Sequence, residues 1–265
     1  MKNFFLALIV FVLYFPILFL AFYSFNSAGN MTSFEGFTLE YYRNVLTDDR
    51  LMSIIFNTLS IALISSSIAT IFGLSGALML YLIRSKHMRS TYLSINNILI
   101  VSPDVIIGSS FLILFMYLGI QLGFVSVLLS HIAFSIPIAT LMILPKLYEM
   151  NDEMINAAID LGASKLDVLT KIVLPNIKPG LIAAFLMSLT YSLDDFAVSF
   201  FVTGNGFSVL SVEIYSMARK GITMEINAIS TLIFVIVMIL IAVYYMVTQR
   251  AVSYTHLTLP TSDLV

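Results

Sequence analysis

Long apolar runs separated by shorter polar segments dominate the chain. Residues 3–34, 51–83 and 105–145 contain no Asp, Glu, Lys or Arg. A helix needs about 20 predominantly apolar residues to cross the roughly 30 Å hydrocarbon core of a bilayer. The pattern therefore predicts an all-α integral membrane protein. We expect six transmembrane helices, at residues 4–23, 54–83, 92–118, 124–144, 179–202 and 228–248.

Composition supports a membrane protein and excludes several other classes. Hydrophobic residues make up 59% of the chain and charged residues 11%, where a soluble domain carries roughly 25% charged residues. The first apolar run is longer than the usual apolar region of a signal peptide, so we expect it to be retained as a helix. The absence of Cys excludes disulfides and thiol chemistry, and the three His have no metal-ligand spacing. A net charge of −2 provides no basic surface for nucleic acid.

The distribution of cationic residues predicts the orientation. If the N-terminus lies inside, nine Lys and Arg fall on inner segments and four on outer segments, which the positive-inside rule favours with both termini in the cytoplasm. The inner residues are Lys2, Arg84, Lys86, Arg89, Lys146, Lys165, Lys171, Lys178 and Arg250, and the outer ones are Arg43, Arg50, Arg219 and Lys220.

The connections between the apolar runs differ in length. The outer segments are predicted to hold short helices at 39–46 and 210–220, and residues 145–178 form the one sizeable inner segment. We find no internal repeat, so residues 1–250 are expected to form a single transmembrane domain. Residues 251–265 are interpreted as a disordered or non-native tail, because 254–265 are a Thr, Leu, Pro and Ser mixture without helical period.

The inner segment reads as two short helices joined at a glycine. Asn151 or Asp152 can cap the first helix, and Gly162 suits the left-handed position that ends it. Ser164 can cap the second helix, with Asp167 three residues later as its partner in a capping box.

Two proline residues follow this second helix. Pro175 is expected to end it, and Pro179 suits the first turn of the next span. Both short helices carry an apolar face. That face either seeks a partner or packs on the protein's own inner surface.

The spacing within this segment resembles the EAA loop of ABC importer permeases of the binding-protein-dependent, MetI-like type. Four elements match it: Ala157-Ala158, Gly162, Ile172 and Leu174-Pro175. The resemblance implies a type I importer permease fold whose cytoplasmic coupling helix, within 151–175, docks in a cleft of an ATPase subunit. The coupling residues it implies are Asn156, Ala157, Ala158, Gly162, Ala163, Ser164, Lys165, Ile172, Leu174 and Pro175.

One position departs from that family pattern. Asn156 stands where the family has Glu, so the polar contact of that Glu is not carried over. Glu153, one turn earlier, is a candidate substitute.

Three acidic residues lie inside the predicted spans, which contain no Lys or Arg. Asp104 is expected near the membrane midplane, about twelve residues from the inner end of its helix, and Asp194 and Asp195 lie in the outer half of the fifth span. A charge at such depth costs at least about 2.5–3.5 kcal/mol, so it normally faces a cavity, a partner or a substrate. The three residues therefore predict an acidic pathway for a cationic solute, to which Tyr191 can add cation–π attraction.

Structural roles are the alternatives for these residues. Asp104 follows Pro103 and is a candidate cap for the second half of a broken helix. Asp194 and Asp195 point about 100° apart on a helix, so one of them is expected to face the pathway. Most aromatic residues in spans pack against neighbours, and His131, alone in an apolar helix, is expected to be a hydrogen-bonded structural residue.

A closer resemblance indicates the solute. Residues 102–105, 118–124, 192–195, 201–204 and 214–217 are similar to the permease chains of spermidine/putrescine importers. This resemblance implies a bacterial cell-membrane complex that translocates polyamines by alternating access. It also implies a second permease chain, two ATPase subunits that bind ATP and Mg, and an extracellular polyamine-binding protein. The chain itself is then neither an enzyme nor a cofactor carrier, and it has no GxxxxGK[ST] phosphate-binding loop.

Three other functions compete with this interpretation. The importer could carry another cationic solute, such as a metal cation or an organic amine. An ion-coupled secondary transporter would show an inverted repeat. An intramembrane serine protease would pair Ser109 or Ser110 with His131, although no nucleophile motif surrounds either serine.

Overall fold

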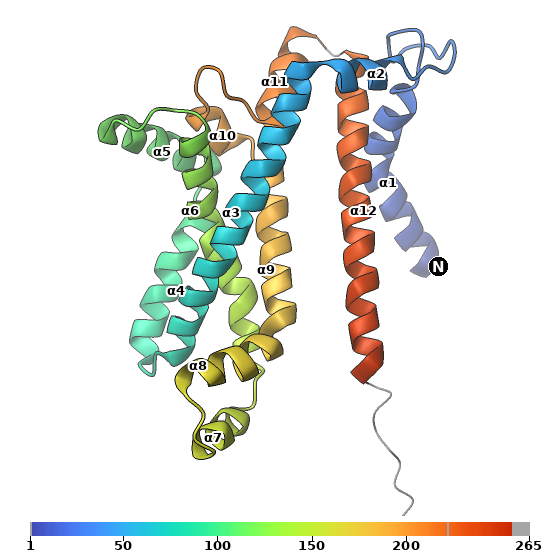
Figure 1. The fold of residues 1–265 in the computed structure, drawn as a ribbon. Coiled ribbons are helices and arrows are strands. Elements are labelled where there is room, and N and C mark those ends of the chain that lie inside the picture. Colours follow the sequence, from blue (N-terminus) through green and yellow to red (C-terminus); the bar gives the residue numbers. More distant parts are fainter. Residues whose placement is uncertain (1, 222, 256–265) are drawn as a thin grey trace, which may run out of the picture. The chain divides into compact units, whose positions relative to one another are not determined.

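The computed structural model describes residues 2–221 and 223–255, and this part of the chain forms twelve α-helices and one π-helical turn (Figure 1). It contains no strand beyond one isolated antiparallel bridge between Asn26 and Phe37. The predicted all-α fold is therefore confirmed. The elements are α1 (Lys2–Tyr23), α2 (Glu40–Thr47), α3 (Asp49–Leu82), α4 (Lys86–Val101), α5 (Asp104–Leu118), α6 (Phe124–Tyr148), α7 (Asp152–Asp160), α8 (Lys165–Asp167), η1 (Val168–Val173), α9 (Leu174–Asp194), α10 (Ala197–Val202), α11 (Leu210–Lys220) and α12 (Met224–Thr255).

The chain divides into two compact units. One comprises Met1–Met52 and Ser216–Val265, and the other comprises Ser53–Tyr215. The inner segment and the acidic residues singled out above all belong to the second unit.

Several helices have the length and composition of membrane spans. Among the described residues, four qualify: Phe4–Tyr23, α3, α6 and the continuous helix Lys165–Asp194. The pair α4–α5 qualifies as one further span if its two bent halves are taken together, and Met224–Ile239 is a shorter apolar helix. The chain is therefore a multi-pass membrane protein, as predicted.

The predicted span at 92–118 is broken near its middle, because α4 and α5 meet at an angle of 98°. Ser102 between them has an extended backbone, with φ −69° and ψ 140°. Pro103 causes this break, since it lacks an N–H and disfavours helical geometry in the residue before it. Asp104 consequently lies in the first turn of α5 and not midway along a continuous helix.

The prediction that Pro175 ends the second helix of the inner segment is wrong. The helix continues from α8 through η1 into α9 as one element, Lys165–Asp194. In η1 the Leu174 N–H donates to the Leu169 carbonyl five residues earlier, which is the π-helical pattern. Pro175 follows at the start of α9, where a missing N–H is tolerated.

The predicted fifth span also ends earlier than expected. Helix α9 ends at Asp194, and Asp195 is extended, with φ −63° and ψ 118°. The chain resumes as the short helix α10, which lies beside α5 at the opposite end of the second unit from α7 and α8 (Figure 1).

Close packing of small residues joins the long helices of the second unit. A Cβ added to Gly73 on α3 would lie 2.5 Å from the Cβ of Ala139 on α6, so the backbones approach too closely for a larger side chain. A buried apolar cluster at one end of the unit includes Leu80, Ile143, Leu147 and Ile177. A second cluster at the other end joins α5, α6 and α10. These clusters stabilise the two ends of the second unit, where the candidate sites lie.

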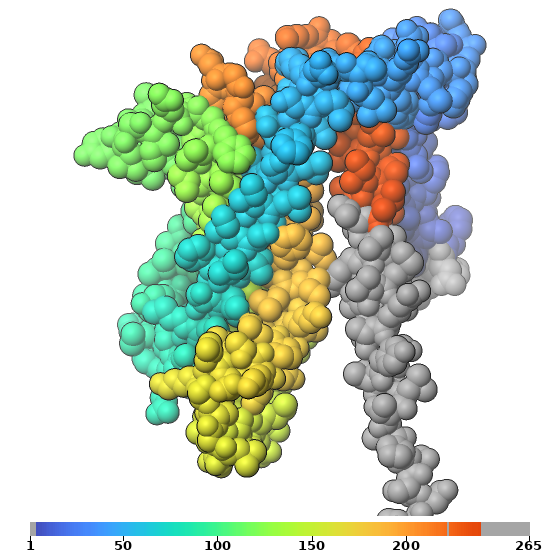
Figure 2. Space-filling model, viewed as in Figure 1, coloured from blue at the N-terminus to red at the C-terminus, as the bar shows by residue number. Residues whose placement is uncertain are grey.

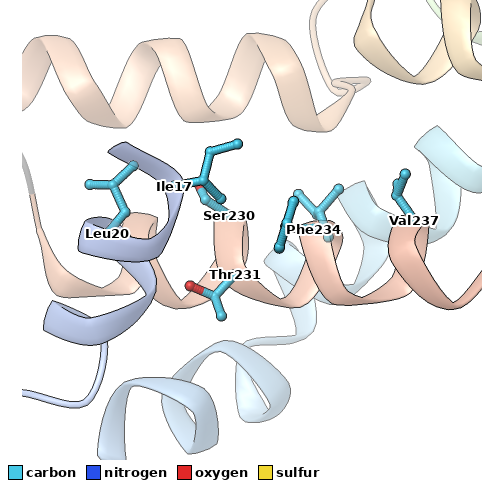
Figure 3. A pocket seen from close by; sticks show the side chains of 7 residues that line it. Ile17, Leu20, Ser230, Thr231, Phe234 and Val237 are labelled. Carbon is cyan, nitrogen blue, oxygen red and sulfur yellow. The ribbon is translucent and has the colours of Figure 1, made fainter. Parts of the chain in front are cut away.

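In the first unit, α12 packs against α1 and α2. An apolar pocket of about 360 Å³ lies between α1 and α12 (Figure 3). The residues that line it are Ile17, Leu20, Ser230, Thr231, Ile233, Phe234 and Val237. Helix α12 runs to Thr255, and the rest of the predicted tail, 256–265, lies outside the described residues.

The two short helices predicted in the outer segments are both present. Helix α2 occupies the position predicted at 39–46, and α11 has the predicted bounds. Both lie in the longer connections, which confirms the local helical pattern of those segments.

Candidate functional site

The helix pair α7–α8 is built by local capping, as the sequence predicts. The Asn151 side chain accepts a hydrogen bond from the Glu153 N–H at 2.9 Å. At the end of α7, Gly162 has φ +85°, and its N–H donates to the Ile159 carbonyl at 2.9 Å. A left-handed backbone of this kind is accessible to glycine with little strain, so Gly162 fixes the turn between the two helices.

The second helix of the pair begins with the predicted capping box. The Asp167 N–H donates to Ser164 Oγ at 3.1 Å, and that hydroxyl donates to the Asp167 carboxylate at 2.5 Å. Lys171 Nζ also lies 2.5 Å from Asp167 Oδ1, one turn further on. These contacts fix the start of α8 without help from the rest of the chain.

One face of the helix pair packs on the second unit's own core. Ile155 and Ala158 of α7 lie against the buried cluster around Ile143 and Leu147, as does Leu169 of η1 directly after the pair. This is the packing alternative raised by the sequence, and it accounts for part of the apolar face.

The other face of the pair carries large apolar side chains that no described residue covers. Leu161 is 89% exposed and Leu166 is 69% exposed, and Met154 and Ile159 are exposed as well. The space-filling view shows the pair (yellow) projecting from one end of the second unit (Figure 2). Of the predicted coupling residues, exposed ones are Asn156, Ala157, Gly162, Ser164, Lys165 and Pro175, and partly buried ones are Ala158, Ala163, Ile172 and Leu174.

A chain of aromatic and polar contacts ties the helix pair to three longer helices. The Tyr81 hydroxyl at the end of α3 donates to the Asp152 carboxylate of α7 at 2.5 Å. The Tyr81 and Tyr148 rings have centroids 5.7 Å apart. Arg89 of α4 donates to the Tyr148 hydroxyl, and its guanidinium carbon lies 4.6 Å from the centre of that ring. These residues connect α7 with α3, α4 and α6. Sequence reasoning missed the contacts because the hydrogen-bonded partners are 71 and 59 positions apart.

The acidic residues separate into exposed and buried ones. Asp104, Asp194 and Tyr191 are exposed, and Tyr191 Oη lies 3.5 Å from Asp104 Oδ1. This contact brings together the starting turn of α5 and the last turns of α9, which are 87 residues apart in sequence. Tyr191 also packs edge-to-face against Phe134, with ring centroids 5.4 Å apart. Two of the four predicted pathway residues therefore meet at one place.

Asp195 lies in a different environment, because its side chain is only 7% exposed. Its carboxylate accepts hydrogen bonds from the backbone N–H groups of Val198 at 3.2 Å and Ser199 at 2.8 Å. Its Oδ2 atom lies 3.4 Å from His131 Nε2. Asp195 thus caps α10 and pairs with the histidine, so the structure separates it from the exposed pair of Asp104 and Tyr191.

His131 is the centre of a buried polar network, in agreement with the structural role expected for it. Its Nδ1 atom lies 2.6 Å from Ser192 Oγ, and its Nε2 atom lies 3.0 Å from Ser199 Oγ. Ser192 Oγ in turn lies 3.2 Å from Ser65 Oγ of α3. The network joins α3, α6, α9 and α10 around the break in the fifth predicted span. A single His in a charge-free run was the one sequence signal for it.

The serine residues considered for protease chemistry do not contact His131. Ser109 and Ser110 both donate to the carbonyl of Ile106 within α5, at 3.1 Å and 2.7 Å. The serines that do contact His131 are fully or almost fully buried. The arrangement fits a structural network better than a nucleophile that a peptide could reach.

Solved structures identify the class of this fold. A chain of a bacterial ABC transporter that imports the acidic polysaccharide alginate matches with a TM-score of 0.72 at 17% identity, covering 92% of each chain. A chain of the MetNI methionine ABC transporter in an inward-facing conformation matches with a TM-score of 0.65 at 21% identity, covering 78% of this chain and 99% of that one. The helical arrangement is therefore that of ABC importer permeases.

The chain belongs to the family of binding-protein-dependent transport system inner membrane components, whose sequence profile matches residues 1–253. It is 35% identical to the spermidine/putrescine permease PotC of Haemophilus influenzae, over 94% of this chain and 97% of that protein. It is 37% identical to PotC of Escherichia coli, over 91% of each chain. The putrescine permease PotI of Escherichia coli is 35% identical, over 83% of this chain and 81% of its own length.

Proposed function

We propose that this chain is the permease subunit of an ATP-driven importer that moves polyamines into the cytoplasm by alternating access. The observation that carries the proposal is the similarity to spermidine/putrescine permeases, which extends over nearly the whole chain. Putrescine permeases are similar as well, so the shared feature of the relatives is a small linear polyamine as solute.

The exposed acidic residues support a cationic solute. Asp104 and Asp194 present carboxylates in helices that cross or line the membrane region, and Tyr191 adds an aromatic ring beside Asp104. A carboxylate at membrane depth is favourable when it faces a cation or a water-filled cavity. A polyamine supplies two to four ammonium groups for such carboxylates and rings.

The helix pair supports coupling to a partner ATPase. Its exposed apolar side chains, above all Leu161 and Leu166, need cover that the chain itself does not supply within the described residues. Docking of an ATPase subunit on this face would bury them. The contacts through Tyr81, Asp152 and Tyr148 then connect movement of the pair to the ends of α3, α4 and α6.

We further propose six transmembrane helices in one domain, with both termini in the cytoplasm. The α4–α5 pair and α12 supply the fifth and sixth spans beside the four long apolar helices. The complex contains a second permease chain, ATPase subunits that hold ATP and Mg, and an extracellular binding protein. One of the similar solved transporters was crystallised with its periplasmic binding protein, which supports the last partner.

The test is uptake of labelled spermidine and putrescine by the purified complex reconstituted in liposomes. We expect uptake that requires ATP and the binding protein, and that unlabelled polyamine competes away. ATP-dependent uptake of another cation without polyamine uptake would contradict the proposed solute. Uptake driven by an ion gradient without ATP would contradict the importer mechanism and favour a secondary transporter.

A further inference from the structure

The break between α4 and α5 leaves polar groups without helical partners. In a continuous helix the carbonyl of Leu99 would accept from residue 103, but Pro103 has no N–H. The carbonyls of Ile100 and Val101 would accept from Asp104 and Val105, which instead begin α5 in a direction 98° away. The last turn of α4 therefore presents carbonyl oxygens, at the negative end of its helix dipole, without intrahelical donors.

An open pocket of about 590 Å³ lies beside these carbonyls. Its lining alternates polar and apolar groups from one face of α4 and from the break. The residues that line it are Ser94, Asn97, Ile98, Val101, Ser102 and Pro103. Asp104, which is exposed and is the first residue of α5, follows this lining directly in the chain.

Asn97, one of the lining residues, has a side-chain oxygen without a hydrogen-bond donor in the described part of the chain. Its Oδ1 atom is buried and accepts no hydrogen bond from any described residue. A buried acceptor without a donor is costly in a protein and more so at membrane depth, so such atoms usually have a partner. The neighbouring Asn96 is satisfied, because its amide donates to the Pro137 carbonyl at 3.2 Å. Asn97 also lines the pocket, so a ligand with N–H donors bound there is a candidate partner for this oxygen.

Several of the polar groups around the pocket are hydrogen-bond acceptors. Backbone carbonyls, the Asn97 amide oxygen and the hydroxyl oxygen of Ser102 all accept hydrogen bonds, and Ser102 already uses its proton on the Ile98 carbonyl at 2.6 Å. No Lys or Arg is among the lining residues. Acceptors at a helix carboxyl end favour a cation with several N–H donors, which is the description of a primary ammonium group.

We propose that this pocket binds one terminal ammonium group of the transported polyamine, while Asp104 binds a neighbouring amine. The proposal rests on the proposed polyamine function and deepens it, because it assigns Ser94, Asn97, Ser102 and the last carbonyls of α4 to the solute. An ammonium group in the pocket would supply hydrogen-bond donors to the carbonyls that the break leaves without helical partners. The broken helix is then a solute-binding element and not merely a packing solution.

A charge series at Asn97 tests the pocket in the reconstituted complex. The liposomes contain no amino-lipids, so that lipid head groups do not compete with the polyamine for the pocket. We expect Asn97→Leu to raise the KM for spermidine uptake about tenfold, as for the loss of one charge-assisted hydrogen bond. Asn97→Asp should keep or lower that KM, and Asn97→Lys, which places a tethered ammonium in the pocket, should abolish uptake.

Controls separate a binding role from a structural one. Thr91→Val, an exposed position one to two turns earlier on α4, should leave uptake at the wild-type level. ATP hydrolysis stimulated by the binding protein should persist in the Asp and Leu variants, which shows that the complex is assembled. Equal effects of Leu, Asp and Lys at position 97, or wild-type KM in Asn97→Leu, would overturn the pocket. Failure of the wild-type complex to move any polyamine would instead overturn the proposed function.

Discussion

The hydroxyl of Tyr81 donates a 2.5 Å hydrogen bond to the carboxylate of Asp152, and this contact joins the end of α3 to the start of α7. If the helix pair transmits movement from an ATPase, this bond is a route from the pair to a long helix other than α9, with which α8 is continuous. The Tyr148 ring contacts the Tyr81 ring at a tilt of 45°, and Arg89 donates to the Tyr148 hydroxyl, so the same path extends to α6 and α4.

We expect Tyr81→Phe to weaken coupling while leaving the fold intact. The ring and its contact with Tyr148 remain, but the bond to Asp152 is lost. Uptake should fall several-fold, whereas ATP hydrolysis by the complex continues, so that more ATP is hydrolysed for each solute moved. Parallel uptake and ATPase assays measure that ratio, and Tyr92→Phe on α4 provides a control. An unchanged ratio in Tyr81→Phe would show that this bond does not transmit movement.

Leu161→Glu should prevent docking of the ATPase subunit. Leu161 is 89% exposed and is the most exposed of the apolar side chains on the pair, so a carboxylate there costs the free chain little. Burial of the same charge against an ATPase surface would be unfavourable. Copurification of the ATPase subunit is the measurement, with Leu46→Glu on α2 as a matched exposed leucine. Normal copurification of the Leu161 variant would place the ATPase elsewhere.

Gly162→Val should disturb the same interface through the backbone. A β-branched residue at φ +85° is strained, so the turn between α7 and α8 is expected to shift and the ATPase to dissociate more readily. Gly206 has the same φ of +85° and lies in the loop between α10 and α11. As at Gly162, a Cβ added there would have no neighbouring atom within 4 Å. Gly206→Val therefore reproduces the local strain without touching the pair, and it should copurify normally with the ATPase. Equal losses in both variants would attribute the effect to general destabilisation.

Asp104→Asn should reduce polyamine uptake and leave stability unchanged. The residue is exposed, and its carboxylate has one contact, with Tyr191, at 3.5 Å. Loss of its charge removes one ion pair with an ammonium group, which we expect to lower uptake about tenfold at subsaturating polyamine. Glu149→Gln, an exposed carboxylate paired with Lys146, is the control. Wild-type uptake in Asp104→Asn would remove this residue from the pathway.

Asp195→Asn should lower the stability of the protein, because this carboxylate is buried and holds α10 and His131. An amide in its place cannot accept both N–H bonds of α10 and the His131 contact with equal strength. The loss of about 1–3 kcal/mol predicts a melting temperature lower by about 2–10 °C in detergent. The melting temperature is measured by heating the protein with a dye whose fluorescence rises when it binds the unfolded chain. A normal melting temperature with abolished uptake would return Asp195 to the solute pathway.

The parts of the fold that sequence predicted are those set by neighbouring residues. The cap at Asn151, the turn at Gly162 and the capping box at Ser164 each depend on side chains within three positions, and all are present. Apolar runs likewise identified the long helices, because bilayer thickness fixes their length.

The features that sequence missed depend on contacts across the chain or on how a proline is accommodated. The pairing of Asp195 with His131 joins positions 64 residues apart, and nothing in either local pattern indicates it. Pro103 breaks a helix fully whereas Pro175 does not, because a π-helical turn precedes Pro175 and supplies a place for a residue without N–H. The same residue type thus gave two outcomes that only the surrounding backbone distinguishes.

The π-helical turn η1 also determines how the helix pair is oriented relative to α9. A π turn holds one residue more than the α-helix on either side of it, so α8 and α9 are out of register with each other by about 100° of rotation. Conversion of η1 to α-helix would have to rotate the packed face of α9, with Ile177 and Gly180, away from α6. Otherwise it would have to rotate the helix pair before η1, with Ile155 of α7, away from the core against which it packs. The extra residue therefore sets the angle at which the projecting helix pair is presented, and it offers a single defined step, one residue of helical register, by which that angle can change.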